Sequence, residues 1–197
     1  MNTSIRFFED QFRQQIHAGP LPLNPFEQRA LPYLHGEVLD YGCGLGNLSL
    51  AAARQGCRVT ALDASATAVA HLLRLAQVEG LPLRAIQADL RDHVLTGHFD
   101  AVVCIGLLMF FDPATAARQW QQLQQHLRPG GVAVLNVLVH GTTYMDMFDP
   151  DSHCLWAAQA VAALFEGWEV LDSAQEEFEA PRSLCKRFVT VVARKPL

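Results

Sequence analysis

Charged residues, and lysine in particular, are scarce in this chain. Only 18% of its 197 residues are charged, and Lys186 and Lys195 are its only lysines. Its 20 acidic side chains outnumber its 15 lysines and arginines, which gives a formal net charge of −5. Such a chain lacks the positive field that attracts nucleic acid or an anionic membrane surface. We therefore expect neither nucleic acid nor a membrane among its partners.

Long hydrophobic runs and paired cysteines are also missing. The longest apolar run, residues 101–111, contains a glycine and is shorter than the ~18 residues that a membrane-spanning helix needs. The first ten residues lack the continuous apolar segment of a secretory signal. The 5 cysteines are odd in number and never spaced as Cys-x-x-Cys. We therefore expect no disulfide framework, no metal site and a reducing, cytoplasmic location.

The chain does contain a regular alternation of apolar segments and helical patterns. Half of its residues are hydrophobic, which excludes global disorder, and its length fits one domain. Parallel strands covered on both faces are continuously apolar and are joined by helical crossovers. The sequence thus predicts an α/β fold with a doubly wound, mostly parallel sheet. The expected core strands are residues 38–41, 57–62, 83–88, 99–105 and 132–139.

Two crossover helices have recognisable starts and buried faces. Ser65 is expected to cap the first helix, and Asp112, followed by Pro113, the second. We place the glutamines of the second helix, Gln119 included, on its solvent side. Apolar spacing predicts the inner faces, which are Val69, Leu72, Leu73 and Ala76 in the first helix and Ala116, Trp120, Leu123 and Leu127 in the second.

Two segments interrupt the alternation. Residues 1–36 contain 4 of the chain's 10 prolines, and we interpret them as one short helix and a loop, forming an N-terminal lid segment before a domain of residues 37–197. Residues 141–153 are polar and are expected to form a loop over the carboxyl edge of the sheet. A helix near 155–165 and two strands near 168–178 and 185–194 complete the predicted order.

A glycine-rich turn follows the first predicted strand. In Gly42-Cys43-Gly44-Leu45-Gly46, the glycines let a ligand approach backbone N–H groups at the positive end of the next helix. The dinucleotide fingerprint needs a glycine where Asn47 stands, which disfavours a nicotinamide cofactor. Asp40, just before the turn, would repel a pyrophosphate but would accept hydrogen bonds from an ammonium group.

Acidic residues also follow the second and third strands. Asp63 can accept hydrogen bonds from both hydroxyls of a ribose, and Asp89 can accept from an amine on a purine ring. Because the carboxyl ends of parallel strands share one edge of the sheet, a single ligand can meet all three acids. S-adenosylmethionine has the required amino-acid end, ribose and adenine.

Several stretches together resemble the class I S-adenosylmethionine-dependent methyltransferases from about residue 36 to the end. They are residues 37–46, 63–65, 88–90, 99–103 and 127–131. The resemblance implies a Rossmann-like seven-stranded sheet of order 3-2-1-4-5-7-6 with strand 7 antiparallel. It also implies a set of cofactor-binding residues: Asp40, Gly42, Cys43, Gly44, Asp63, Ala64, Ala88, Asp89, Leu90 and Ile105.

Within this family, residues 107–111, 165–169 and 186–195 resemble the tellurite-resistance (TehB-like) branch. That branch carries a His-Arg pair just before the last strand, whereas residues 176–182 here contain no histidine. Apolar residues 107–111 and the loop residues Met145, Met147 and Phe148 predict a hydrophobic chamber. We therefore expect a thiol, a chalcogen or a small phenol as methyl acceptor.

Three residues near this chamber are candidates for a catalytic role. Tyr144 matches a tyrosine of the resembled branch, and a role only in packing the roof of the chamber is an equal alternative. Arg187 can hold an anionic acceptor or be a solvated edge residue, and His140 can act as a base or simply end a strand. Methyl transfer is an in-line displacement in which positioning supplies most of the acceleration, so the chemistry requires none of them.

Three functions remain open from the sequence. The first is a methyltransferase that acts on a small soluble molecule, as a monomer or a homodimer. The second is a protein that binds S-adenosylmethionine without turnover, and the third is a nucleotide-dependent oxidoreductase.

Overall fold

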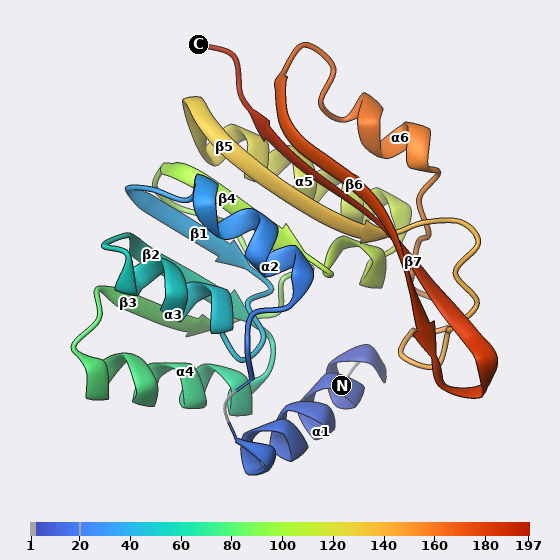
Figure 1. The fold of residues 1–197 in the computed structure, drawn as a ribbon, viewed down its shortest axis with the longest axis horizontal. Helices are drawn as coiled ribbons and strands as arrows, with labels where there is room; N and C mark the ends of the chain where they lie inside the picture. The colour runs from blue at the N-terminus through green and yellow to red at the C-terminus, as the bar shows by residue number, and fades with distance from the viewer. Residues whose placement is uncertain (1–2, 20) are drawn as a thin grey trace.

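The protein is built around one seven-stranded sheet (Figure 1). A computed structural model describes residues 3–19 and 21–197. Its strands are β1 (Glu37–Tyr41), β2 (Arg58–Asp63), β3 (Leu83–Gln87), β4 (Phe99–Ile105), β5 (Leu127–Leu138), β6 (Glu169–Ala180) and β7 (Leu184–Arg194). The order is β3-β2-β1-β4-β5-β7-β6, and β7 runs antiparallel to both of its neighbours. The predicted topology is confirmed.

Helices cover both faces of this sheet, as Figure 1 shows. They are α1 (Thr3–Ala18), α2 (Pro25–Ala30), α3 (Asn47–Arg54), α4 (Ala66–Glu79), α5 (Pro113–His126) and α6 (Ala158–Ala163), with short 3-10 turns at Leu31–Tyr33, Leu108–Phe110 and Pro181–Ser183. Helices α2, α3 and α4 pack on one face, and α5 and α6 on the other. None of the helices in the described ranges is long and apolar enough to cross a membrane.

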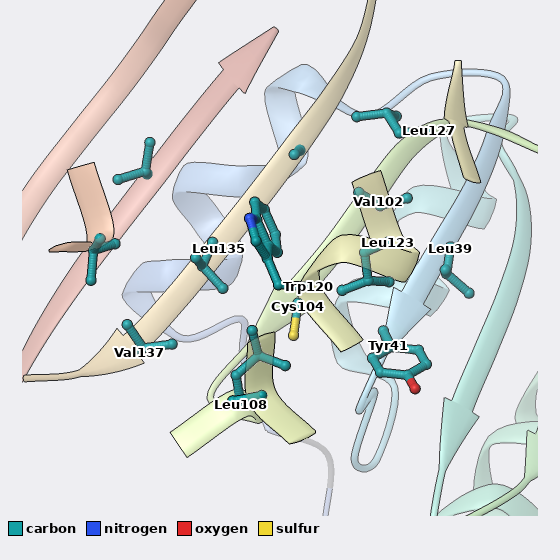
Figure 2. Packing of buried hydrophobic residues seen from close by; sticks show 14 of the residues in the cluster. Leu39, Tyr41, Val102, Cys104, Leu108, Trp120, Leu123, Leu127, Leu135 and Val137 are labelled. Carbon is teal, nitrogen blue, oxygen red and sulfur yellow. The ribbon is translucent and has the colours of Figure 1, made fainter. Parts of the chain in front are cut away.

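Alternate residues of each strand supply the two hydrophobic layers, because successive strand side chains point to opposite faces. Val38 belongs to the layer beneath α2, α3 and α4, whereas Leu39 and Tyr41 belong to the layer beneath α5. Trp120 of α5 lies in the middle of the second layer (Figure 2). These two layers fix the carboxyl ends of the parallel strands at one edge of the sheet.

The predicted caps of α4 and α5 are confirmed, and their predicted inner faces are correct except that Leu73 and Gln119 were assigned to the wrong side. The Ser65 hydroxyl accepts a hydrogen bond from Ala68 N, and the Asp112 carboxylate accepts one from Thr115 N, each at 3.0 Å. Leu73 is 42% exposed rather than buried. Gln119 is 2% exposed, because its side chain lies 3.0 Å from the buried Tyr41 hydroxyl and donates to the Arg91 carbonyl.

The N-terminal segment is more helical than the sequence predicted. Helix α1 has 16 residues and ends at Ala18, before the first proline. Pro25 occupies the first turn of α2, where a missing N–H costs nothing, and Asn24 and Glu27 form a reciprocal capping box. The prediction of one short helix and a loop is therefore wrong. At the other end of the chain, α6 is shorter than predicted.

Candidate active site

A cavity of about 520 Å³ opens at the carboxyl edge of the sheet. Its walls come from α1, the glycine turn, the segments that follow β2, β3 and β4, the 141–153 loop and β7. Figure 1 shows α1 beyond the ends of the parallel strands, between α4 and the tip of the β6–β7 hairpin. The cavity therefore lies where the acidic strand ends and the predicted acceptor chamber were expected.

The glycine turn is held by backbone hydrogen bonds and leaves its outer side open. The amides of Gly42 and Cys43 both donate to the Leu62 carbonyl oxygen at 2.9 Å. Gly44 has a φ of +53°, and a Cβ at this position would lie 3.2 Å from the ring of Phe12 in α1. A side chain here would strain the backbone and press on α1, so the close approach requires glycine.

Asp40 is a buried acid at the floor of the cavity. It is 5% exposed, and its carboxylate accepts a hydrogen bond of 2.6 Å from the Ser49 hydroxyl in α3. Its pKa is raised to about 7, mainly by burial and also by the charges of Glu27 and Asp63, while the Ser49 hydrogen bond acts against this rise. An ammonium group placed against this carboxylate would favour its ionised form.

Asp63 fixes the glycine turn to the start of α4. One carboxylate oxygen accepts from Gly44 N and the other from Ser65 N, each at 2.8 Å. Burial raises the pKa of Asp63, and the backbone hydrogen bonds act against this rise. Each oxygen retains a lone pair, so the carboxylate can still accept from two hydroxyl groups.

Asp89 is engaged by a neighbouring arginine. Its carboxylate accepts from Arg91 N at 3.1 Å and from Arg91 Nε at 2.9 Å, and the hydrogen bonds from the Arg91 side chain hold its pKa below the ordinary value. Both residues line the cavity beside the buried Leu90. An adenine amine would share Asp89 with Arg91.

Most of the predicted cofactor residues line the cavity, and one does not. The lining includes Asp40, Gly42, Cys43, Gly44, Asp63, Ala64, Asp89, Leu90 and Ile105. Ala88 packs against the core instead, and its amide donates to the Asp63 carbonyl. Burial raises the pKa of the Cys43 thiol well above its ordinary value, so this side chain is a neutral filler in the turn.

The other end of the cavity is rich in aromatic and apolar side chains, as predicted. Phe8 of α1 packs edge-on against Phe110 at 5.0 Å between ring centroids, and Phe110 packs against Phe148 at 4.9 Å. Phe26 of α2 and Phe188 of β7 lie 4.7 Å apart at a further wall. We call this end, with Leu107, Met109 and Met147, the aromatic chamber.

The structure separates the three catalytic candidates. Tyr144 lines the aromatic chamber. His140 is exposed outside the cavity, where its backbone N–H donates to the Trp156 carbonyl. Arg187 Nε donates to a Glu177 carboxylate oxygen at 2.6 Å, also outside the cavity. The geometry therefore supports neither His140 nor Arg187 as a residue that contacts an acceptor.

Among the polar residues of the cavity wall that sequence reasoning missed are Lys186 and Asn136. Lys186 lines the aromatic chamber, with its amine 4.6 Å above the centre of the Tyr144 ring. Asn136 of β5 is fully buried beside the cavity, where its amide donates to the Thr190 hydroxyl at 2.9 Å. Asn136 lies in an apolar run that gave no reason to select it. Lys186 could have been predicted, because side chains alternate along a strand, and Lys186 therefore points to the opposite face from Arg187.

Comparisons with known proteins point to one family. A family model described as a methyltransferase domain matches residues 38–131. A ubiquinone biosynthesis O-methyltransferase from Pseudomonas aeruginosa is 35% identical over 134 residues, covering 66% of this chain and 56% of that protein. One from Yersinia pestis is 33% identical over 138 residues, covering 68% and 55%. This chain therefore spans little more than half the length of these curated relatives.

Solved structures share the fold at low sequence identity. TehB from Haemophilus influenzae has a TM-score of 0.76 at 20% identity, covering 95% of this chain and 67% of that one. The N-methyltransferase NodS from Bradyrhizobium japonicum, in complex with S-adenosylhomocysteine, has a TM-score of 0.73 at 16% identity, with both chains covered in full.

Proposed function

This chain belongs to the class I S-adenosylmethionine-dependent methyltransferases, and from that premise we propose that it methylates a small molecule held in the aromatic chamber. In such a transfer, the acceptor atom bonds to the methyl carbon as the carbon–sulfur bond of the sulfonium breaks, the electron pair stays on sulfur, and any acceptor proton passes to water. Because this leaving group is good, the protein contributes mainly by holding the acceptor in line.

The residues at the floor of the cavity fit S-adenosylmethionine. Asp40 is a buried carboxyl whose charged form a ligand ammonium would stabilise. Asp63 is held rigidly by two backbone amides, with lone pairs left for two hydroxyls. Gly44 leaves the backbone accessible between them. The juxtaposition of these three groups is the observation that carries the proposal.

The aromatic chamber supports a small phenol, a thiol or a chalcogen as acceptor. Such groups lose little hydration energy on entering an apolar site, whereas a free oxyanion loses much. The curated relatives are named as O-methyltransferases, which favours the phenol. Arg182 and Arg187 are paired with Asp146 and Glu177, so neither is available to hold a tellurite ion.

An acceptor screen tests this proposal. Release of S-adenosylhomocysteine is measured with phenols, thiols, selenite and tellurite side by side, in the parent and in Arg187→Ala. We expect turnover with a phenol or a thiol, unaffected by Arg187→Ala because this side chain faces away from the cavity. Turnover of tellurite alone, lost in Arg187→Ala, would refute the hydrophobic acceptor.

The acceptor screen and a second experiment test the two alternative functions. Tight binding of S-adenosylhomocysteine with no turnover of any acceptor would indicate a binding protein without catalysis. A titration with NADH examines the oxidoreductase. We expect no binding of NADH, because Asn47 replaces the third glycine and Asp40 would repel the pyrophosphate.

A further inference from the structure

Lys186 lies where the β6–β7 hairpin extends past the rest of the sheet. The pairing of β5 with β7 ends at Leu138 and Phe188, whereas β6 and β7 continue to pair through Phe178 and Lys186. Figure 1 shows the tip of this hairpin reaching beyond the ends of the parallel strands. Lys186 and Phe188 share one face of β7 and both line the cavity. The overhanging part of the hairpin is therefore a wall of the aromatic chamber.

The amine of Lys186 lies over an aromatic ring and forms no ion pair with the described residues. It lies 4.6 Å from the centre of the Tyr144 ring. Within residues 3–19 and 21–197, no carboxylate forms an ion pair with it, whereas Arg91, the other basic residue of the cavity wall, is paired with Asp89. Lys186 is half-buried, and burial lowers the pKa of its amine. A partly desolvated ammonium without a counter-charge favours an anionic ligand group.

Lys186 lies at the opposite end of the cavity from the residues that fit the cofactor. Strand β7 is separated from β1, which carries Asp40, by β4 and β5. Three inter-strand spacings amount to roughly 14 Å. Asp63 and Asp89 follow β2 and β3, still farther from β7. An anionic group that reaches Lys186 therefore belongs to the acceptor.

We propose that the methyl acceptor is a small aromatic acid, whose carboxylate binds Lys186 and whose ring lies in the aromatic chamber with its hydroxyl or thiol directed to the cofactor end. This proposal rests on the proposed function. Tyr144 contributes to the same site, since its hydroxyl makes no hydrogen bond within the described chain and is available to the carboxylate. Lys186 is thus a residue that determines specificity rather than one that takes part in the chemistry.

Matched pairs of acceptors test the role of Lys186. The pairs are 3-hydroxybenzoate with phenol and 3-mercaptobenzoate with benzenethiol, compared in the parent, Lys186→Met, Lys186→Arg and Arg187→Met. In Lys186→Met we expect the KM for the acid to rise roughly ten- to a hundredfold, the effect of losing a charge-assisted hydrogen bond. The kcat and the KM for the partner without a carboxylate should change little, and Lys186→Arg should restore most of the loss.

Arg187→Met is the matched control, because Arg187 neighbours Lys186 in sequence but pairs with Glu177 outside the cavity. It should leave every KM unchanged. The melting-temperature rise with S-adenosylhomocysteine verifies that each variant is folded and binds cofactor.

Several results would overturn the inference. Equal KM values for the acid and its partner without a carboxylate in the parent, or an acid KM that is unchanged in Lys186→Met, would show that no carboxylate binds Lys186. If S-adenosylhomocysteine binds but nothing turns over, the proposed function fails instead. Calorimetric titration of both acids into the protein–S-adenosylhomocysteine complex then decides the carboxylate site separately, and no binding of either acid would overturn it.

Discussion

At the scale of single residues, Asp40 links cofactor binding to pH. Its pKa is raised to about 7 by burial, and a ligand ammonium binds its ionised form. We expect the affinity for S-adenosylhomocysteine to weaken as the pH falls below about 7, approaching tenfold per pH unit. Calorimetry between about pH 6 and about pH 8 measures this change, and Asp40→Asn should bind weakly at every pH. A flat profile in the parent would place the ammonium away from Asp40.

Without ligand, Asp40 has the opposite effect on folding. The folded state holds its proton more tightly than the unfolded chain does, because the pKa in the folded state is raised. The contribution of Asp40 to the free energy of unfolding is therefore fully present below the pKa of the unfolded chain. It declines as the pH rises towards about 7.

Asp63 and Asp89 should differ in how much each contributes to cofactor binding. Asp63 holds Gly44 N and Ser65 N, whereas Asp89 is bonded to Arg91 at the cavity rim. We expect Asp63→Ala to weaken S-adenosylhomocysteine binding by at least about tenfold, because it removes the acceptor for the ribose hydroxyls and releases the glycine turn. Asp89→Ala should cost less, since the arginine already occupies its carboxylate. Equal losses measured by calorimetry would show that the ribose lies elsewhere.

Arg187, a catalytic candidate that lies outside the cavity, is on a strand whose facing depends on distant partners. The alternation of β7 was predictable, but which alternate set faces the cavity is fixed by the pairing of Phe188 with Leu138. Arg187 was therefore chosen, and its neighbour Lys186 is the residue that lines the chamber. By contrast, local sequence was enough to predict Asp40, Gly44 and Asp63 as site residues. They lie at the carboxyl ends of parallel strands, and this edge of the sheet is where ligands bind in such folds.

At the scale of elements, α1 lies over the cavity and is held to two other parts of the protein. Glu9 accepts hydrogen bonds from the Ser65 and Thr67 hydroxyls at the start of α4. At the first turn of α1, the Ser4 hydroxyl accepts from Asp149 N at 3.2 Å. Farther along α1, the Phe12 ring lies against Gly44. This arrangement supports the expectation that the N-terminal segment is a lid.

Loosening this lid should speed cofactor release. Glu9→Gln removes the charge that holds the two hydroxyls, so we expect the dissociation rate of S-adenosylhomocysteine to rise roughly tenfold. Arg13→Gln is the control, because Arg13 is exposed and pairs only with Glu9 and Asp10 of its own helix. Stopped-flow displacement gives both rates. An unchanged rate in Glu9→Gln would mean that α1 does not gate the cofactor.

The sequence predicted the elements of the central sheet better than those at its margins. Buried parallel strands are continuously apolar, and their turns contain glycine or acidic residues, so β1 to β4 were located to within a residue or so. Helix α1 was underestimated because the prolines that follow it were taken to disfavour helix over the whole segment 1–36. Gln119 was misplaced because a buried glutamine needs a distant partner, the Tyr41 hydroxyl, which local spacing cannot show.

At the scale of the whole molecule, the cofactor should stabilise the fold. The residues proposed to bind it come from β1, β2 and the turns after them, and α1 lies over this part of the cavity, so an unfolded chain offers no comparable site. Ligand at 100 times its Kd then adds about 2.7 kcal/mol to the free energy of unfolding. For a chain of this size we expect the melting temperature to rise by roughly 5–11 °C. No rise with saturating S-adenosylhomocysteine would contradict the cofactor assignment.

The overhang of the β6–β7 hairpin places acceptor recognition and cofactor binding on different elements, which can evolve separately. Lys186 lies past the last pairing of β7 with β5, so this part of β7 pairs with β6 and not with a parallel strand of the sheet. Asp40 and Gly44, which fit the cofactor, lie on other elements. Because the proposed acceptor contact lies at the hairpin tip, we expect mutations there to alter which molecule is accepted while cofactor binding persists. A lineage with this architecture can adopt a new acceptor without passing through an ancestor that has lost its methyl donor.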